Sequence, residues 1–166
     1  MPSEAIPHII GTVSLLLVMA TVLLMSNMIL VYVNNDAIKV SLKETTTYIS
    51  HEVVEIASLA SSTGSSALFI YRLLDVPYNL QNYGYIIKYV KDNLGWKVVA
   101  YLNEFNTISA ESRLNWSSGV NVINSTQIVN GIISNKPSIN SGASKIVIWC
   151  QRFTNGTISV GMGVMI

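Results

Sequence analysis

Charged residues are scarce in this chain. Asp, Glu, Lys and Arg make up only 11% of the residues, against about 25% in a typical soluble domain, and half of all residues are hydrophobic. The net charge is +1, and there is no basic stripe with interleaved aromatic side chains of the kind that holds nucleic acid. The composition therefore predicts a membrane-associated protein and excludes a nucleic-acid-binding one.

Cysteine and histidine are also nearly absent. The single cysteine, Cys150, excludes a disulfide bond within the chain, and two histidines, His8 and His51, are too few for a zinc cluster. His51, Glu52 and Glu55 resemble part of a metal-binding helix motif, but a zinc site of that type needs a second histidine on the same helix. We interpret these three residues as a solvated helix face, and we expect neither a metal nor a cofactor.

The region after residue 66 contains no histidine, so no serine there has an imidazole base of the kind found in a Ser-His-Asp triad. A glycine-rich phosphate loop is missing as well, because GMGVM near the C-terminus is strand sequence with small residues on one face. We therefore expect that the protein is not an enzyme.

Glycine and proline are missing from a long stretch that begins near the N-terminus, between Gly11 and Gly64. Residues 9 to 33 form a run of about 25 residues without a charge, which is enough to cross a hydrocarbon core of ~30 Å as a helix. A cleaved signal peptide has a basic start, an apolar run of only ~7 to 15 residues and a small-residue cleavage site. None of these features is found, so we predict a retained transmembrane helix over residues 6 to 33.

The helix is predicted to continue to about residue 61, which makes residues 1 to 61 the N-terminal helical region. Between residues 34 and 61 the apolar side chains recur at helical spacing and mark one face of an amphipathic helix. This apolar stripe consists of Ile38, Leu42, Ile49, Val53, Ile56 and Ala60. We expect the stripe to be a helix–helix interaction face. Residues 62 to 66, in a small polar cluster around Gly64, are predicted to be a flexible joint.

The pattern changes to that of β-strands from residue 67 onward. Runs rich in Val, Ile, Tyr, Phe and Trp alternate with turn signals: LFIYRLLD, YGYIIKYVKD, WKVVAYLNEF, KIVIWCQRF and TISVGMGVMI, with weaker runs at 119–123 and 127–133. Asn155-Gly156 favours a type I′ hairpin turn between the last two strong runs. We predict a small antiparallel β-sandwich of six or seven strands, pilin-like or Ig-like, over residues 67 to 166, and hence an α+β fold class.

Two features of the β region bear on its surroundings. Alternation in KIVIWCQRF puts Cys150 on the same face as Ile146 and Ile148, so we interpret it as a buried structural residue. Three Asn-x-Ser/Thr sequons are candidate N-glycosylation sites: Asn115, Asn124 and Asn155. A chain this rich in Asn, Ser and Thr contains about three sequons by chance, so only their location in the β region hints that this region faces outward.

The stretch SEAIPHIIGTVSLLLVMATVLL, followed without a break by an amphipathic helix, a Ser/Gly joint and a β domain, resembles the archaeal type IV pilin-like proteins. Within them it is most similar to the archaellum accessory (stator) proteins of the FlaG/FlaF type, and RLLDVPYNLQNYGYIIKYV looks like the first hairpin of such domains. The resemblance covers the architecture of the whole chain, while its motifs are loose. It implies a single-pass protein of the cell membrane whose partners are pilin-like or archaellum subunits, or the surface layer.

The N-terminus departs from that family. Pilins and archaellins carry a short basic leader that a peptidase removes, whereas no basic residue precedes Glu4, and we expect no such cut. In filament subunits an acidic residue near the processed N-terminus pairs with the terminal amine of a neighbour. The resemblance therefore implies a helix–helix role for Glu4; from the residues alone it is an interfacial carboxylate, favoured near a helix N-terminus.

Two lines of argument disagree on the orientation in the membrane. Lys39 and Lys43 flank only the C-terminal side of the span, and the positive-inside rule would place that side in the cytoplasm. The β region with its few charges and the family resemblance favour placement outside the cytoplasm, which we expect.

Together these features predict a structural, non-enzymatic component of an archaellum or type IV pilus-like machine for cell motility. Its β domain would brace the filament or motor against the cell envelope, and it would act as a homo- or hetero-oligomer in contact with membrane lipid. Two alternatives are the filament-forming subunit itself, located in an extracellular filament, and a membrane-anchored surface binding module.

Overall fold

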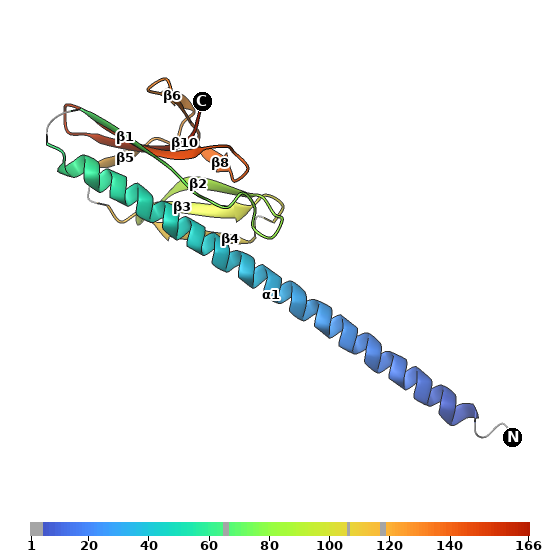
Figure 1. Cartoon of the computed structure of the whole chain (residues 1–166). Helices are drawn as coiled ribbons and strands as arrows, with labels where there is room; N and C mark the ends of the chain where they lie inside the picture. The colour runs from blue at the N-terminus through green and yellow to red at the C-terminus, as the bar shows by residue number, and fades with distance from the viewer. Residues whose placement is uncertain (1–4, 65–66, 106, 117–118) are drawn as a thin grey trace. The chain divides into compact units, whose positions relative to one another are not determined.

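A computed structural model describes residues 5–64, 67–105, 107–116 and 119–166. One long helix, α1 (Ala5–Ser62), is followed by ten strands within the described residues (Figure 1). The chain divides into two compact units, Met1–Ala37 and Ile38–Ile166. The second half of α1 therefore belongs to the same unit as the strands, whereas the sequence had suggested a helical region separate from the β domain.

Helix α1 confirms the predicted continuous helix and its ends to within about one residue. It has 58 residues, and no glycine or proline interrupts it between Gly11 and its last residue. The helix ends at Ser62, two residues before Gly64, whose φ of +26° lies in the region that glycine adopts without strain. The small polar cluster after the helix thus contains its stop signal; Ser65 and Ser66, in the predicted joint, lie outside the described residues.

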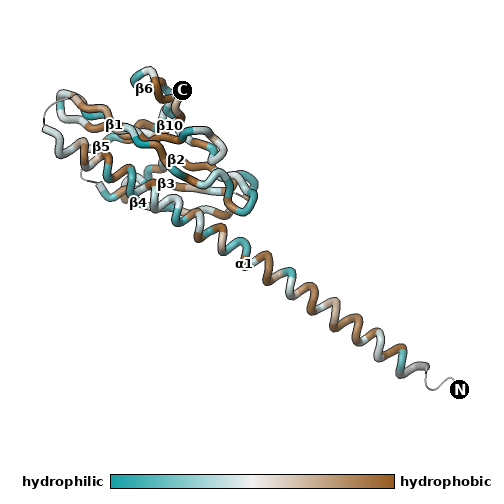
Figure 2. Tube along the Cα trace, viewed as in Figure 1, coloured by the Kyte–Doolittle hydropathy of each residue, from teal (hydrophilic) through white to brown (hydrophobic). Residues whose placement is uncertain are grey.

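In the first unit, α1 carries no charged residue between residues 9 and 33 and is mostly apolar there. Figure 2 shows mostly apolar residues along this part of the helix. The helix is long and apolar enough to cross a membrane, and no residue in its most apolar stretch is buried. A helix that is hydrophobic all round needs an apolar environment, either lipid or other protein.

The second unit contains two sheets. The larger has the strand order β1-β9-β10-β7-β6, with β5 also pairing with β10, and the smaller has the order β4-β3-β2-β8. The strands are β1 (Leu68–Leu73), β2 (Tyr85–Asp92), β3 (Gly95–Leu102), β4 (Ser109–Arg113), β5 (Val120–Val122), β6 (Gln127–Val129), β7 (Ile133–Asn135), β8 (Ser138–Asn140), β9 (Ile146–Arg152) and β10 (Ile158–Met165). The α+β class is confirmed.

The sequence predicted purely antiparallel sheets, but one pair of the described strands is parallel. β5 runs parallel to β10, with Val120 opposite Ile158 and Val122 opposite Val160. The reason is that two strands share the second edge of β10: β5 pairs with its first half, and β7 pairs antiparallel with its second half. β5 follows β4, which lies in the smaller sheet, so it reaches β10 by crossing between sheets and not through a hairpin.

The hairpin between β9 and β10 is confirmed, but its turn differs from the predicted type I′. The amide of Gly156 donates to the carbonyl of Phe153, the amide of Phe153 donates to the carbonyl of Thr157, and only Gly156 in the loop has positive φ, at 83°. This is the three-residue loop in which a type I turn ends at a glycine that forms a bulge. Asn155 instead accepts a hydrogen bond from the amide of Thr157 on its side-chain oxygen.

Three strands of the second unit were not predicted from the sequence: β4, β7 and β8. The run predicted over 127–133 is interrupted at Asn130 and Gly131, which have φ of 54° and 73° and form a turn between β6 and β7. β4 reads as SAESR and has alternating exposed and half-buried residues. β8 has three residues and follows Pro137. Short or polar edge strands like these have few β-branched residues to reveal them.

The second unit has one main core and one satellite cluster. The main core joins the buried residues of α1 with the inner faces of both sheets, including Tyr85, Val98, Ile148 and Val160. The satellite lies on the opposite face of the larger sheet and contains Val129, Ile133, Val147 and Trp149. The predicted alternation in β9 is confirmed, because Ile146, Ile148 and Cys150 belong to the main core while Val147 and Trp149 belong to the satellite.

Candidate functional site

The apolar segment of α1 is the first candidate site. Both threonines of this segment bond to the helix itself: Thr12 Oγ1 donates to the carbonyl of His8, and Thr21 Oγ1 donates to that of Val18 at 2.8 Å. Such back-bonding to the preceding turn lets hydroxyl residues enter a lipid-facing helix. These two bonds, together with the length and apolar composition of the segment, are compatible with a hydrocarbon environment.

The apolar stripe on the second half of α1 was predicted to contact another helix. In the structure it is buried within its own chain and is not free to do so. All six stripe residues are at most 1% exposed: Ile38, Leu42, Ile49, Val53, Ile56 and Ala60. They pack in the main core against the inner faces of both sheets. The physical reason is that the sheets present apolar faces of their own, and burying stripe and sheets together removes both from water. The partner that the stripe requires is therefore the β domain of the same chain.

Polar contacts tie α1 to the smaller sheet. Lys43 Nζ donates to the carbonyl of Glu111, and Ser50 Oγ donates to the carbonyl of Arg113 at 2.7 Å. β4 is an edge strand, and because a single residue, Ser112, lies between Glu111 and Arg113, their carbonyls point to the same side of it. The helix thus occupies two backbone acceptors of this edge, which could otherwise pair with another strand.

An ion-pair cluster ties α1 to the larger sheet. Arg72 on β1 contacts Glu52 through Nη1. It also binds Glu55 through Nη1 at 2.8 Å and through Nη2 at 3.3 Å. This hydrogen bonding lowers the pKa of Glu55 below its ordinary value, and the two carboxylates raise the pKa of Arg72. Sequence reasoning missed Arg72, since nothing in its own segment points to two glutamates on a distant helix.

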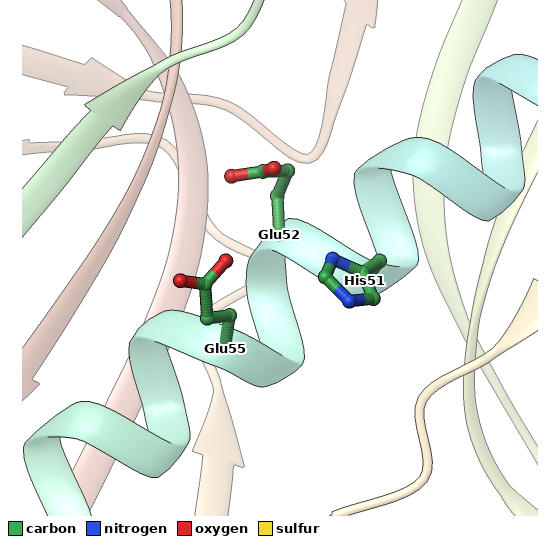
Figure 3. A group of neighbouring side chains, drawn as sticks. All are labelled: His51, Glu52 and Glu55. Carbon is green, nitrogen blue, oxygen red and sulfur yellow. The ribbon is translucent and has the colours of Figure 1, made fainter.

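The same glutamates form the predicted motif with His51. Figure 3 shows His51, Glu52 and Glu55 on neighbouring turns of α1, and their ligand-type atoms lie within 4.8 Å of one another. Carboxylates and imidazole are suitable ligands for a divalent cation, but here both carboxylates are already paired with one arginine, Arg72. Within the described residues, no other group of three His, Cys, Asp or Glu side chains lies close enough together to share a metal ion. The ion pair with Arg72 assigns the carboxylates a structural role.

The C-terminal end of α1 is capped by a side chain from β9. Nη1 of Arg152 donates to the carbonyls of Ala60, Ser61 and Thr63 at 2.8, 2.9 and 3.2 Å. The last carbonyls of a helix have no partner within the helix and carry partial negative charge, so a guanidinium satisfies both needs. This contact was not predicted either, because it joins residues about ninety positions apart.

The remaining predicted site residues divide into three groups. Glu4 lies outside the described residues. Asn115, Asn124 and Asn155 are all exposed, which is compatible with glycosylation but leaves it a prediction. Cys150 is completely buried, and burial raises the pKa of its thiol to about 11, so it stays protonated and behaves as a small apolar residue.

Charged residues on the smaller sheet are also paired with one another. Lys97 contacts Glu111 at 2.6 Å and Asp92 at 3.5 Å, and Lys88 lies over the ring of Tyr101 at 4.7 Å. Hydrogen bonding from the amide of Leu94, together with nearby cations, lowers the pKa of Asp92. These pairs stabilise a sheet surface and its turn.

No protein-family model, curated protein or solved structure matches this chain. The functional argument therefore rests on the residues and geometry described above.

Proposed function

We propose that this protein is a structural, non-enzymatic component of an archaellum or type IV pilus-like machine. Residues 9 to 33 would hold it in the cell membrane, and the β domain, outside the cytoplasm, would brace a filament or motor against the cell envelope. Its partners would be pilin-like or archaellum subunits and the surface layer. The proposal combines the architecture of the chain with the family resemblance that its sequence shows.

The observation that carries the proposal is the double role of α1. One uninterrupted helix contains an apolar segment with no buried residues and a second segment whose stripe lies in the core of the β unit. The second segment is fastened at three further places, by contacts with β4, β1 and Arg152. A helix that is part of the core passes force to the whole domain, which suits a load-bearing anchor better than a domain on a flexible tether.

The burial of the stripe changes which surface meets other subunits. Contacts with other helices would involve residues 9 to 33 within the membrane or a filament, while contacts outside it would involve the surface of the β domain. Four polar side chains of α1 bond to the sheets and fasten the helix: Lys43, Ser50, Glu52 and Glu55. This use of charged residues supports a structural role.

Fractionation and mass spectrometry test the proposal directly. We expect the full chain in the membrane fraction, with a β domain that external protease digests in whole cells, and its intact mass reports whether the N-terminus is processed. Recovery in sheared filaments would instead identify the filament-forming subunit. Digestion only after the cells are opened would contradict the proposed orientation.

A pair of variants tests the anchor itself. Leu17→Arg places a charge in the middle of the apolar segment, where a translocon scale assigns a cost of about 2.5 to 3.5 kcal/mol. Leu59→Arg makes the same change at a position of α1 that is 45% exposed within the β unit. We expect only Leu17→Arg to shift the protein out of the membrane fraction; equal shifts would argue against residues 9 to 33 as the anchor.

A second pair tests the load-bearing role. Asn34→Pro removes a helical hydrogen bond between the apolar segment and the stripe, whereas Asn34→Ala keeps the helix intact. We expect both variants to reach the membrane, and the proline variant alone to reduce the number of attached surface filaments seen by electron microscopy. Normal filament numbers in the proline variant would show that the protein only needs a tether.

A further inference from the structure

Strand β1 is an edge of the larger sheet that remains open within the described residues. It pairs with β9 on one side and with no described strand on the other. With six residues it is longer than the edge strand β8 of the smaller sheet and the edge strand β6 of its own sheet, which have three residues each. The edge strand β5 also has only three residues, and in the edge strand β4 the carbonyls of Glu111 and Arg113 are occupied by Lys43 and Ser50.

The register of β1 shows which of its backbone groups are free. The amide of Leu74 donates to the carbonyl of Ile146, and Leu73 stands opposite Val147. In an antiparallel pair, successive residues direct their backbone groups alternately toward and away from the partner strand. The N–H and C=O groups of Phe69, Tyr71 and Leu73 therefore point away from β9, and no described residue bonds to them.

The same three residues give this edge an apolar side. Phe69, Tyr71 and Leu73 project to the face opposite the main core, where Phe69 stacks on Trp149 at 6.3 Å and lies 6.3 Å from the ring of Tyr71. Tyr71 and Leu73 are 44% and 52% exposed. An exposed edge strand with free backbone groups and apolar side chains is a template for a further strand, and natural proteins usually protect such edges.

The other side of β1 carries charge. Arg72 binds Glu52 and Glu55, so one positive and two negative charges leave one net negative charge, and the Glu55 side chain is 43% exposed. A strand paired outside β1 would lie about 4.8 Å beyond it. A lysine or arginine on its helix-facing side, beside Arg72, would then be near Glu55.

We infer that β1 is the docking edge for an extended segment of a different protein, added antiparallel to β1 as a further strand of the larger sheet. Alternate residues of that segment are apolar and cover Phe69, Tyr71 and Leu73, and the residues between them are basic and face Glu55. The backbone groups of β1 provide affinity, and the alternating side chains provide specificity.

A second copy of this chain does not suit the edge. β1 runs antiparallel to the α1 segment beside it, because Arg152, opposite Leu68, caps the end of α1, whereas Arg72 binds Glu52 and Glu55 two turns earlier. Antiparallel pairing of two β1 strands would therefore reverse the direction of the two helices. Two copies held by one membrane enter the domain in the same direction, so this step rests on the proposed anchor.

The test uses the full chain in detergent and a fluorescent, end-blocked heptapeptide that alternates valine with lysine. We expect saturable binding by fluorescence anisotropy. A matched peptide with glutamate in place of lysine should bind at least about tenfold more weakly. Methylation of the valine amides, which would face β1, should abolish binding, whereas methylation of the lysine amides should preserve it.

Variants of the edge complete the test. Tyr71→Pro removes an outward N–H without removing a bond to β9, so it should weaken binding at least about tenfold, while Tyr71→Val should change it less than about threefold. No binding of the valine and lysine peptide, equal binding of the glutamate peptide, or equal effects of the two methylation patterns would overturn the inference. So would dimers of the full chain that Tyr71→Pro dissociates. If Tyr71→Pro loses its fold by circular dichroism, the methylated peptides decide the question with the unmodified protein.

Discussion

The indole nitrogen of Trp149 donates a 2.9 Å hydrogen bond to the side-chain oxygen of Asn135, and both residues are almost completely buried. The amide nitrogen of Asn135 in turn donates to the carbonyls of Ile123 and Ser125. One asparagine thus connects β9 with the loop between β5 and β6. Because each polar group here has a partner, the satellite cluster is closed at little desolvation cost.

This arrangement requires glycine at position 161. A Cβ there would lie 2.4 Å from the Asn135 side-chain oxygen and 2.5 Å from the Trp149 ring. We expect Gly161→Ala to lower the free energy of unfolding by about 1 to 3 kcal/mol or more, as overpacking does in a closed core. Urea denaturation followed by tryptophan fluorescence measures the change. Gly142→Ala is the control, because its Cβ would meet only the ring of Tyr78, which is 66% exposed and can move.

The stripe on α1 should determine stability. Ile49→Ala removes a completely buried side chain from the main core, and we expect a loss of about 2 to 5 kcal/mol in the free energy of unfolding. Val40→Ala, at a position of the same helix that is 54% exposed, should change it by less than about 0.5 kcal/mol. Thermal or urea unfolding distinguishes the two variants. If Ile49→Ala and Val40→Ala were equally stable and Ile49→Ala lost an oligomer, the stripe would be a helix–helix contact, as the sequence had predicted.

The cap on α1 should depend on the guanidinium of Arg152. Arg152→Gln removes a charged donor shared by three carbonyls, and we expect a loss of about 1.5 to 3 kcal/mol. Amide hydrogen exchange should increase most in the last turn of α1, because its carbonyls lose their partner. Arg113→Gln, whose side chain reaches only Asp92 at 3.9 Å, is the control. A uniform increase in exchange over the whole domain would argue against a local cap.

Stability should depend on pH through the pair of Arg72 and Glu55. Hydrogen bonding and charge attraction by Arg72 lower the pKa of folded Glu55, so the unfolded chain takes up the proton first as the pH falls. The pair therefore stabilises the fold above the unfolded pKa of Glu55 and loses its contribution as the pH falls through the folded value. Glu55→Gln should flatten the acid limb of the stability curve, measured by urea unfolding at several pH values. The same change at the exposed Glu104 should leave the slope as it is.

Local patterns were sufficient for much of this fold. Hydrophobic periodicity and the lack of glycine and proline located α1, and the runs rich in Val, Ile and aromatic residues located β1, β2, β3, β9 and β10. The failures occurred where the local signal is weak. β4 and β8 are short edge strands with polar residues, and the turn at Asn130 and Gly131 lies within a run that reads as one strand. The Asn-Gly pair there is the same signal that located the last hairpin, and it could have divided the run.

The candidate sites were harder to predict than the elements. Lys43, Ser50, Arg72 and Arg152 take part in the fastening of α1, yet each bonds to a residue between 17 and 92 positions away. No spacing rule connects such pairs. The stripe shows the same limit of local patterns. Its six residues were identified correctly, but the surface against which they pack was not.

The sequence by itself determined that this protein has an apolar, charge-free helix long enough to cross a membrane, and that the helix continues into an amphipathic segment before a β region. Run length and periodicity are properties of neighbouring residues, so they can be read without a fold. Only the tertiary structure decided that the stripe is buried by the chain's own sheets, that the glutamates beside His51 are paired with an arginine, and that β1 is left as an open edge among the described residues. These outcomes depend on which distant surfaces meet, because burial, ion pairing and strand pairing are completed by residues far apart in the chain.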